Sequence, residues 1–143
     1  MKKYLLLICL ALPMLGFADT SMGEKLTFML WKDIQAKHIK KISHYTSKHF
    51  QAANPTLILT RSQFLQGIKD LLPVDNYQLL NVQTTQGEDV ITVTYLVSTF
   101  SVPVDSLPSI QSSKTVLDVW KKVNDKWKLV SEAVFPCLFD VEL

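Results

Sequence analysis

The sequence predicts an α+β domain in which N-terminal helices pack on a mainly antiparallel β-sheet. Two observations predict this class. Apolar residues in the first half recur at intervals of three and four, which is typical of helices with one buried face. From about residue 75 onward the hydrophobic period changes to two, which is typical of strands that bury one face. A sheet with one apolar face needs a cover, and the amphipathic helices can supply it.

The N-terminus has the three-part pattern of a bacterial secretory signal. Lys2 and Lys3 form a basic start, an apolar stretch follows over residues 5–15, and small residues at Gly16 and Ala18 suit a signal peptidase. The apolar stretch is too short for a permanent membrane span, which needs about 20 residues. We therefore expect residues 1–18 to be removed, Cys9 with them, and residues 19–143 to reach the periplasm or the exterior as a single domain without a stable membrane span.

Composition limits the partners of the mature chain. Loss of the two N-terminal lysines lowers the formal net charge from +2 to zero, which argues against a nucleic-acid partner. One cysteine remains, Cys137, so no internal disulfide can form and a packed core must supply the stability. A buried thiol is the simplest interpretation of Cys137, and an intermolecular bridge or a reactive thiol is the alternative.

A long helical segment is predicted after Ser21. Ser21 and Glu24 form a capping box, in which each side chain satisfies a free backbone N–H group at a helix start. The apolar stripe then runs from Leu26 through Tyr45, and the segment is expected to end before residue 52 because Pro55 disfavours helix just before it. Periodicity does not settle whether Ser43 divides this segment into two helices.

A second helix is predicted after a short apolar segment. Residues 57–59 are compatible with a brief strand. Thr60 and Gln63 form another capping box, and the apolar stripe that follows is stopped by Pro73. The first half of the chain is thus predicted to be helical.

The second half is predicted to be an antiparallel meander. Residues 90–101 are rich in β-branched and aromatic side chains, as expected of a central strand, and residues 77–84 should be its neighbour. A long loop is expected over residues 102–112. Two further strands, 114–123 and 126–135, should be joined tightly through Asn124 and Asp125, which tolerate the left-handed backbone of a hairpin turn.

The last hairpin carries a family resemblance. Trp120 belongs to a Leu-Asp-Val-Trp segment of strand 114–123, and Trp127 belongs to a Trp-Lys-Leu-Val segment of strand 126–135. With the preceding helices, this pattern resembles the nuclear transport factor 2-like superfamily over residues 24–134, in particular its SnoaL-like and ketosteroid-isomerase-like branch. Lys126 departs from the pattern, since the family usually has a turn glycine there. The resemblance implies a curved sheet and a cone-shaped fold with a pocket, in a superfamily of enzymes, carriers, assembly modules and non-catalytic dimers.

Asp118 is the main candidate for chemistry. An isomerase or dehydratase needs a base in a pocket and a donor for the developing oxyanion, and Tyr95 and Tyr45 are the candidate donors. If Asp118 faces inward, it is a costly buried charge that needs a partner such as Tyr95, Lys114 or a histidine. If it faces outward, it is simply solvated or paired across strands. The sequence favours a structural role for Asp118 and ordinary buried roles for the tyrosines.

The same resemblance implies a ligand pocket, and the sequence indicates what it holds and which residues line it. His38, His44 and His49 lack the spacing of a metal site, so we expect neither a metal nor a cofactor. The residues predicted to line the pocket are Trp31, His38, Tyr45, Tyr95, Asp118 and Trp120.

Three functional hypotheses follow, and the first is preferred because no convincing acid–base pair is visible. In the first, a non-catalytic module of the cell envelope binds a small apolar ligand or a protein partner. In the second, an isomerase, dehydratase or cyclase acts on a hydrophobic carbonyl compound. In the third, the chain is a scaffold subunit of an envelope secretion assembly. Apolar residues on both faces of the central strand, such as Val90 opposite Ile91, also predict a homodimer through the open sheet face.

Overall fold

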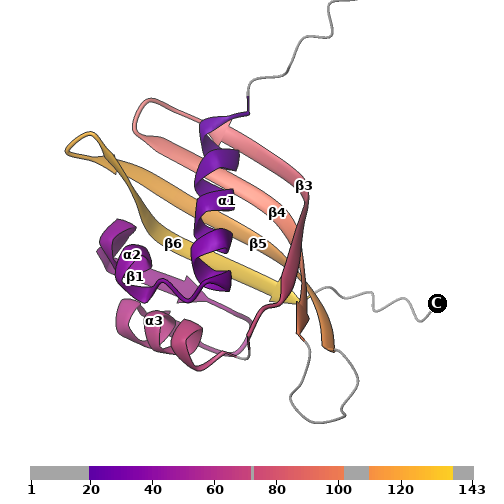
Figure 1. Ribbon diagram of the computed structural model, residues 1–143. Helices are drawn as coiled ribbons and strands as arrows, with labels where there is room; N and C mark the ends of the chain where they lie inside the picture. The colour runs from indigo at the N-terminus through magenta and orange to yellow at the C-terminus, as the bar shows by residue number, and fades with distance from the viewer. Residues whose placement is uncertain (1–19, 72, 102–109, 137–143) are drawn as a thin grey trace, which may run out of the picture.

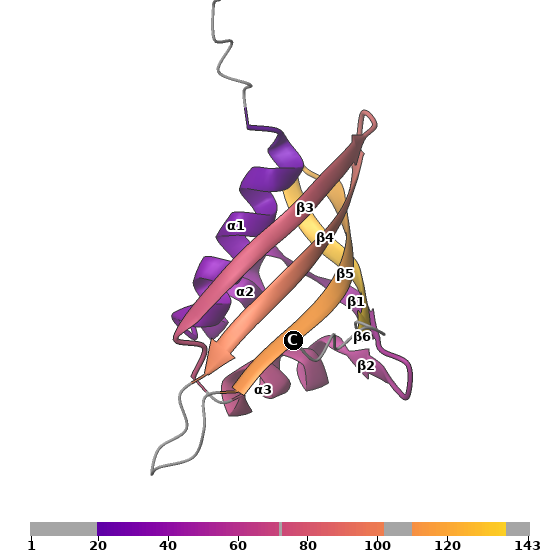
Figure 2. The same ribbon diagram turned by 90° about the vertical axis from the view of Figure 1, so that its right-hand side faces the viewer.

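The computed structural model describes residues 20–71, 73–101 and 110–136. Over this part of the chain three helices lie on the inner face of one curved, six-stranded sheet, so the predicted fold class is confirmed (Figures 1 and 2). None of the described helices is long and apolar enough to cross a membrane. The predicted signal peptide and Cys137 lie outside the described residues.

The elements follow one another with short connections. They are α1 (Met22–Gln35), α2 (Ile39–Tyr45), β1 (Thr46–Ala53), β2 (Ile58–Thr60), α3 (Arg61–Asp70), β3 (Asn76–Gln86), β4 (Val90–Ser101), β5 (Ile110–Val123) and β6 (Lys126–Pro136). The strand order across the sheet is β2-β1-β6-β5-β4-β3. The sheet therefore consists of the predicted meander β3 to β6, extended at one side by β1 and β2.

Helix α1 begins and ends at signals in its own sequence. Both hydrogen bonds of the Ser21–Glu24 capping box are present. Gly23 lets the helix approach the sheet closely, since a Cβ atom there would lie 2.5 Å from Thr84 Cγ2. The helix ends in a Schellman motif: Lys37 adopts a φ of 51°, and the His38 N–H group donates to the Asp33 carbonyl at 2.9 Å. Two helices thus replace the single long segment, and the break lies at residues 36–38, not at Ser43.

Strand β1 corrects the prediction that helix continues to residue 51. Residues 46–53 are a strand that pairs antiparallel to β2 and parallel to β6. Phe50 and Ala52 are buried and the residues on either side of them are exposed, as expected of alternating side chains in a strand. This pairing depends on β6, which lies about 80 residues later in the sequence, so local periodicity could not reveal it.

The last hairpin forms as predicted. Asn124 and Asp125 both have positive φ, 50° and 59°, as a two-residue hairpin turn requires. Strand β5 begins at Ile110, so residues 110–112 are strand and not loop, while residues 102–109 lie outside the described part. The core fills the space between the helices and the inner sheet face, with fully buried side chains at Leu30 and Trp120.

Candidate functional site

A pocket opens between α3 and the inner face of β4, β5 and β6. It has two adjoining parts, of about 280 and 780 Å³, which share much of their lining. The shared lining residues are Phe64, Ile68, Leu71, Ser112, Lys114, Glu132 and Val134. Most of this wall is apolar, and Glu132 and Lys114 are its ionisable groups. An apolar cavity with a few convergent polar groups is the usual form of a small-molecule site.

A directed chain of hydrogen bonds leads from the pocket into the sheet. Trp31, which lines the smaller part, donates its indole N–H to the Tyr95 hydroxyl at 2.9 Å. Tyr95 in turn donates to Asp118 Oδ2 at 2.9 Å. Asp118 is completely buried, so its side chain faces inward and the solvated, outward orientation is excluded. Each donor in the chain strengthens the next by polarisation.

Glu132 completes this chain from the neighbouring strand. It lies directly across from Asp118 in the β5–β6 register, and the two carboxyl groups form a hydrogen bond. Such a bond requires one of the two to be protonated. Asp118 is completely buried, whereas Glu132 is only partly buried and has the Lys114 charge beside it, which favours the ionised form of Glu132. We therefore place the shared proton on Asp118.

Burial sets the protonation of this pair. Desolvation, followed by the Glu132 charge, raises the pKa of Asp118 well above its usual value. Desolvation also raises the pKa of Glu132 to about 7, although Lys114 opposes the rise. Desolvation raises the pKa of Tyr95, and its hydrogen bond to Asp118 acts in the same direction. Glu132 thus exchanges a proton near neutral pH at the wall of an apolar pocket.

The position of Glu132 depends on a β-bulge. From the turn to Trp120, the residues pair in one regular register, with Trp120 opposite Leu129. The register then shifts by one, so that Val119 lies opposite Ser131. Without the shift, Asp118 would lie opposite Ser131. Sequence reasoning missed Glu132 for this reason, although a second carboxylate in the last strand was visible.

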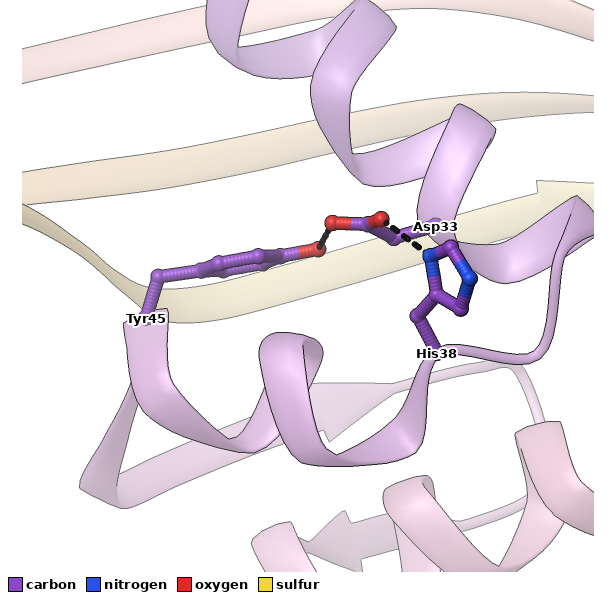
Figure 3. Close-up of polar contacts among 3 residues, drawn as sticks. All are labelled: Asp33, His38 and Tyr45. Atoms are coloured by element: carbon purple, nitrogen blue, oxygen red, sulfur yellow. Dashed lines mark hydrogen bonds and ion pairs between the residues drawn. The ribbon is translucent and has the colours of Figure 1, made fainter.

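A second polar cluster joins α1 to α2 (Figure 3). The carboxylate of Asp33 lies 2.9 Å from His38 Nδ1 and accepts a long hydrogen bond of 3.4 Å from the Tyr45 hydroxyl. The Schellman motif at the end of α1 brings His38 back beside Asp33. Burial and the nearby Asp33 charge raise the pKa of Tyr45. No residue of this cluster lines the pocket.

The predicted site residues are thus divided between two places. Trp31 lines the pocket, while Tyr95 and Asp118 lie buried beside it and contribute through the hydrogen-bond chain. Tyr45 and His38 belong to the second cluster. Trp120 is buried beside the second cluster, with its ring centroid 5.8 Å from that of Tyr45, and it is not among the residues that line the pocket. Their functional roles remain predictions.

No group of three or more potential ligand side chains that could hold a metal ion is found among the residues that the structure describes.

Comparison with solved structures identifies the fold. A scan against protein-family models gives no match, and neither does a search of curated proteins. An NTF2-like protein of unknown function in nutrient uptake from Rhodospirillum rubrum superposes with a TM-score of 0.69 at 17% identity, over 78% of this chain and 95% of that one. The fold is NTF2-like.

Two further NTF2-like neighbours have different roles. A protein described as a scytalone dehydratase from Novosphingobium aromaticivorans matches with a TM-score of 0.70 at 16% identity, over 84% of this chain and 85% of that one. The association domain of C. elegans CaMKII matches with a TM-score of 0.66 at 17% identity, over 77% and 89%. Neighbours on this fold thus include a protein described as a dehydratase and an association domain, so the fold does not decide the function.

Proposed function

We propose that the protein is an exported binding module that holds a small, mainly apolar molecule in the pocket between α3 and the sheet. The observation that carries this proposal is the combination of an apolar lining with Glu132, whose pKa is raised to about 7. Apolar contacts would supply most of the affinity. Glu132 would orient the ligand, because it can donate to a carbonyl when protonated and accept from a hydroxyl when ionised.

A pocket-filling substitution tests this proposal. Val134 lines both parts of the pocket, so Val134→Phe should weaken binding of the fluorescent apolar probe 1-aminoanthracene by about tenfold or more. Val90→Phe is the matched control, because Val90 is 41% exposed and is absent from the pocket lining. Native mass spectrometry of protein from its own host would then identify a retained ligand. Equal binding by both variants would exclude this pocket as the site.

Proton-transfer catalysis is the second candidate, favoured by the same pKa of Glu132. A general base works best when its pKa lies near the operating pH. Here Glu132 would take a proton from a carbon next to a ligand carbonyl. Glu132→Gln should then abolish deuterium incorporation into an aryl methyl ketone in D₂O, while probe binding persists. Exchange that is no faster with wild-type protein than with buffer would count against catalysis on this substrate class.

The proposed export rests on the N-terminal pattern of residues 1–18. N-terminal sequencing of protein recovered from the periplasm or the medium should begin at Asp19. Recovery of the uncleaved chain in the cytoplasm would contradict export.

The proposed protein partner is a second copy of this chain, bound through the outer face of the sheet. On the outer face of the sheet, Leu80 and Phe135 are exposed, whereas Ile91 and Val93 of β4 are buried on the inner side. Sedimentation at tens of micromolar, roughly the range in which weak dimers form, should show association that Phe135→Ser reduces. A strictly monomeric wild type would contradict it.

A further inference from the structure

Charge is distributed very unevenly along this chain. Residues 34–69 contain six Lys or Arg and three His but no Asp or Glu. These residues form the end of α1, then α2, β1, β2 and nearly all of α3, which lie together at one end of the molecule (Figure 1). The balanced total charge therefore conceals a strongly basic region.

The basic side chains of this region are available at the surface. Lys40, Lys41, His44, Lys48 and His49 are all exposed. None of them forms an ion pair with any residue that the structure describes. We call these five residues, together with Arg61, the basic face. Exposed lysines without an ion-pair partner, such as Lys40, Lys41 and Lys48, attract anions from solution.

Hydrogen bonds gather the basic face around the C-terminal end of α2. Arg61 Nη2 donates to the Ser43 carbonyl at 2.7 Å and to its hydroxyl at 2.6 Å, which ties α3 to α2. Lys128 Nζ donates to the His44 carbonyl from β6. A shallow recess of 460 Å³ lies beside this junction, with Lys48, His49 and Arg61 among its lining residues. Arg61 Nε is buried without a hydrogen-bond partner among the described residues.

Exposed apolar residues border the basic face. Among the large apolar side chains of the described residues, Ile58 is the most exposed at 71%. Leu57 and Phe135 follow at 52% each. Thr60 lines the recess, and Ile58 lies two residues before it in β2, so both side chains point to the same face. Aliphatic side chains next to lysines suit a lipid surface, where they can enter the headgroup region. A nucleic-acid backbone would give them no apolar contact.

We propose that the basic face docks the protein on an anionic phospholipid membrane, with Lys41, Lys48 and Arg61 near the lipid phosphates and Ile58 at the headgroup boundary. The attraction is electrostatic and short-ranged, and each basic residue near such a surface raises the binding constant by about fivefold. This proposal is independent of what the pocket binds.

Vesicle sedimentation of the purified protein tests the proposal. Binding to vesicles of about 30% phosphatidylglycerol in phosphatidylcholine should fall by about tenfold or more in the Lys41→Glu/Lys48→Glu variant. The matched control is Lys121→Glu/Lys126→Glu, which makes the same charge change at exposed residues of the β5–β6 hairpin and should change binding less than about twofold. Binding should also disappear at about 0.5 M NaCl.

Further measurements separate this partner from others. Ile58→Ser should weaken vesicle binding without changing its salt dependence, because it removes only apolar contact. Equal binding to pure phosphatidylcholine vesicles, or equal loss in both charge variants, would overturn the proposal. So would binding to a DNA duplex through Lys41 and Lys48 with no binding to vesicles. Release from vesicles by inorganic phosphate at low millimolar concentration would show a site for free phosphate and would equally contradict membrane docking.

Discussion

Two aspartic acid side chains of this protein each accept a hydrogen bond from a tyrosine, yet their surroundings differ. Asp33 interacts with His38 and Tyr45 at the α1–α2 junction, where His38 is 46% exposed. Asp118 is completely buried in the sheet, and beside its tyrosine it has a second carboxyl group, Glu132. Each oxygen of the Asp33 carboxylate has a partner, His38 for one and Tyr45 for the other. The Asp118–Glu132 pair has to retain a proton instead.

The difference shows how the environment selects a role for the same residue types. A carboxylate with a histidine and a tyrosine beside it stabilises the junction of two helices. Two carboxyl groups in one desolvated place cannot both ionise at low cost, so they hold a proton close to neutral pH. Only this second arrangement adjoins a pocket, through Glu132 and Trp31. An acidic side chain alone therefore does not define the site. What defines it is that two carboxyl groups are buried together beside a pocket.

The largest expected effect comes from removing the Asp118 side chain. Asp118→Ala should lower the free energy of unfolding at pH 7 by about 3 kcal/mol, because Tyr95 loses its acceptor and a buried cavity is created. Asp118→Asn should cost less than about 1 kcal/mol, since an amide can accept from Tyr95 and donate to Glu132 as the protonated acid does. Chemical denaturation measures both values. Equal losses in the two variants would mean that Asp118 is ionised in the folded protein.

A smaller effect is expected in the pH dependence of stability. The pKa of Glu132 is raised from its usual value of 4.5 to about 7, so the folded state retains a proton that the unfolded state releases. Its contribution is therefore present below pH 4.5 and is lost as the pH rises to about 7. Glu132 alone should cost the wild type roughly 2 kcal/mol of unfolding free energy between about pH 5 and 8. Glu132→Gln should remove this part of the slope and leave only the part that comes from the raised pKa of Asp118.

A slope that Glu132→Gln leaves undiminished, or a flat profile in the wild type, would count against a carboxyl pair that retains a proton.

Sequence reasoning predicted the elements whose signals are local. The capping boxes at Ser21 and Thr60 start α1 and α3, and the turn at Asn124 closes the last hairpin. Strand β1 was missed because its pairing with β6 is a long-range contact, and propensity alone does not determine such pairing. Tyr95 and Asp118 were recognisable as apolar-face residues of strands.

Two features on which the proposals depend could not be predicted from local sequence patterns. A one-residue bulge decides whether Asp118 faces Ser131 or Glu132, and such bulges have no clear sequence signature in this hairpin. The basic face was visible in the sequence as a segment without acids, but the total charge of zero concealed it. Charge must be counted by segment before a polyanionic partner is dismissed.

The smallest effect is expected at the helix junction. Asp33→Ala removes the contacts to His38 and Tyr45, which are long or partly exposed, and should lower the free energy of unfolding by about 1 kcal/mol. Binding of 1-aminoanthracene should stay within about twofold of the wild type, because Asp33 does not line the pocket. Denaturation and fluorescence titration measure the two quantities. Loss of probe binding would show that the two regions are coupled.

Titration of the side-chain carboxyl carbons by ¹³C NMR tests the shared proton of Asp118 and Glu132 most directly. The structure predicts one ionisation of this pair with a pKa of about 7, seen at the resonances of both residues and absent from Glu132→Gln. If both carboxyl groups have already ionised below about pH 5, close to their ordinary pKa values, the pair shares no proton at neutral pH and the account of the site is wrong.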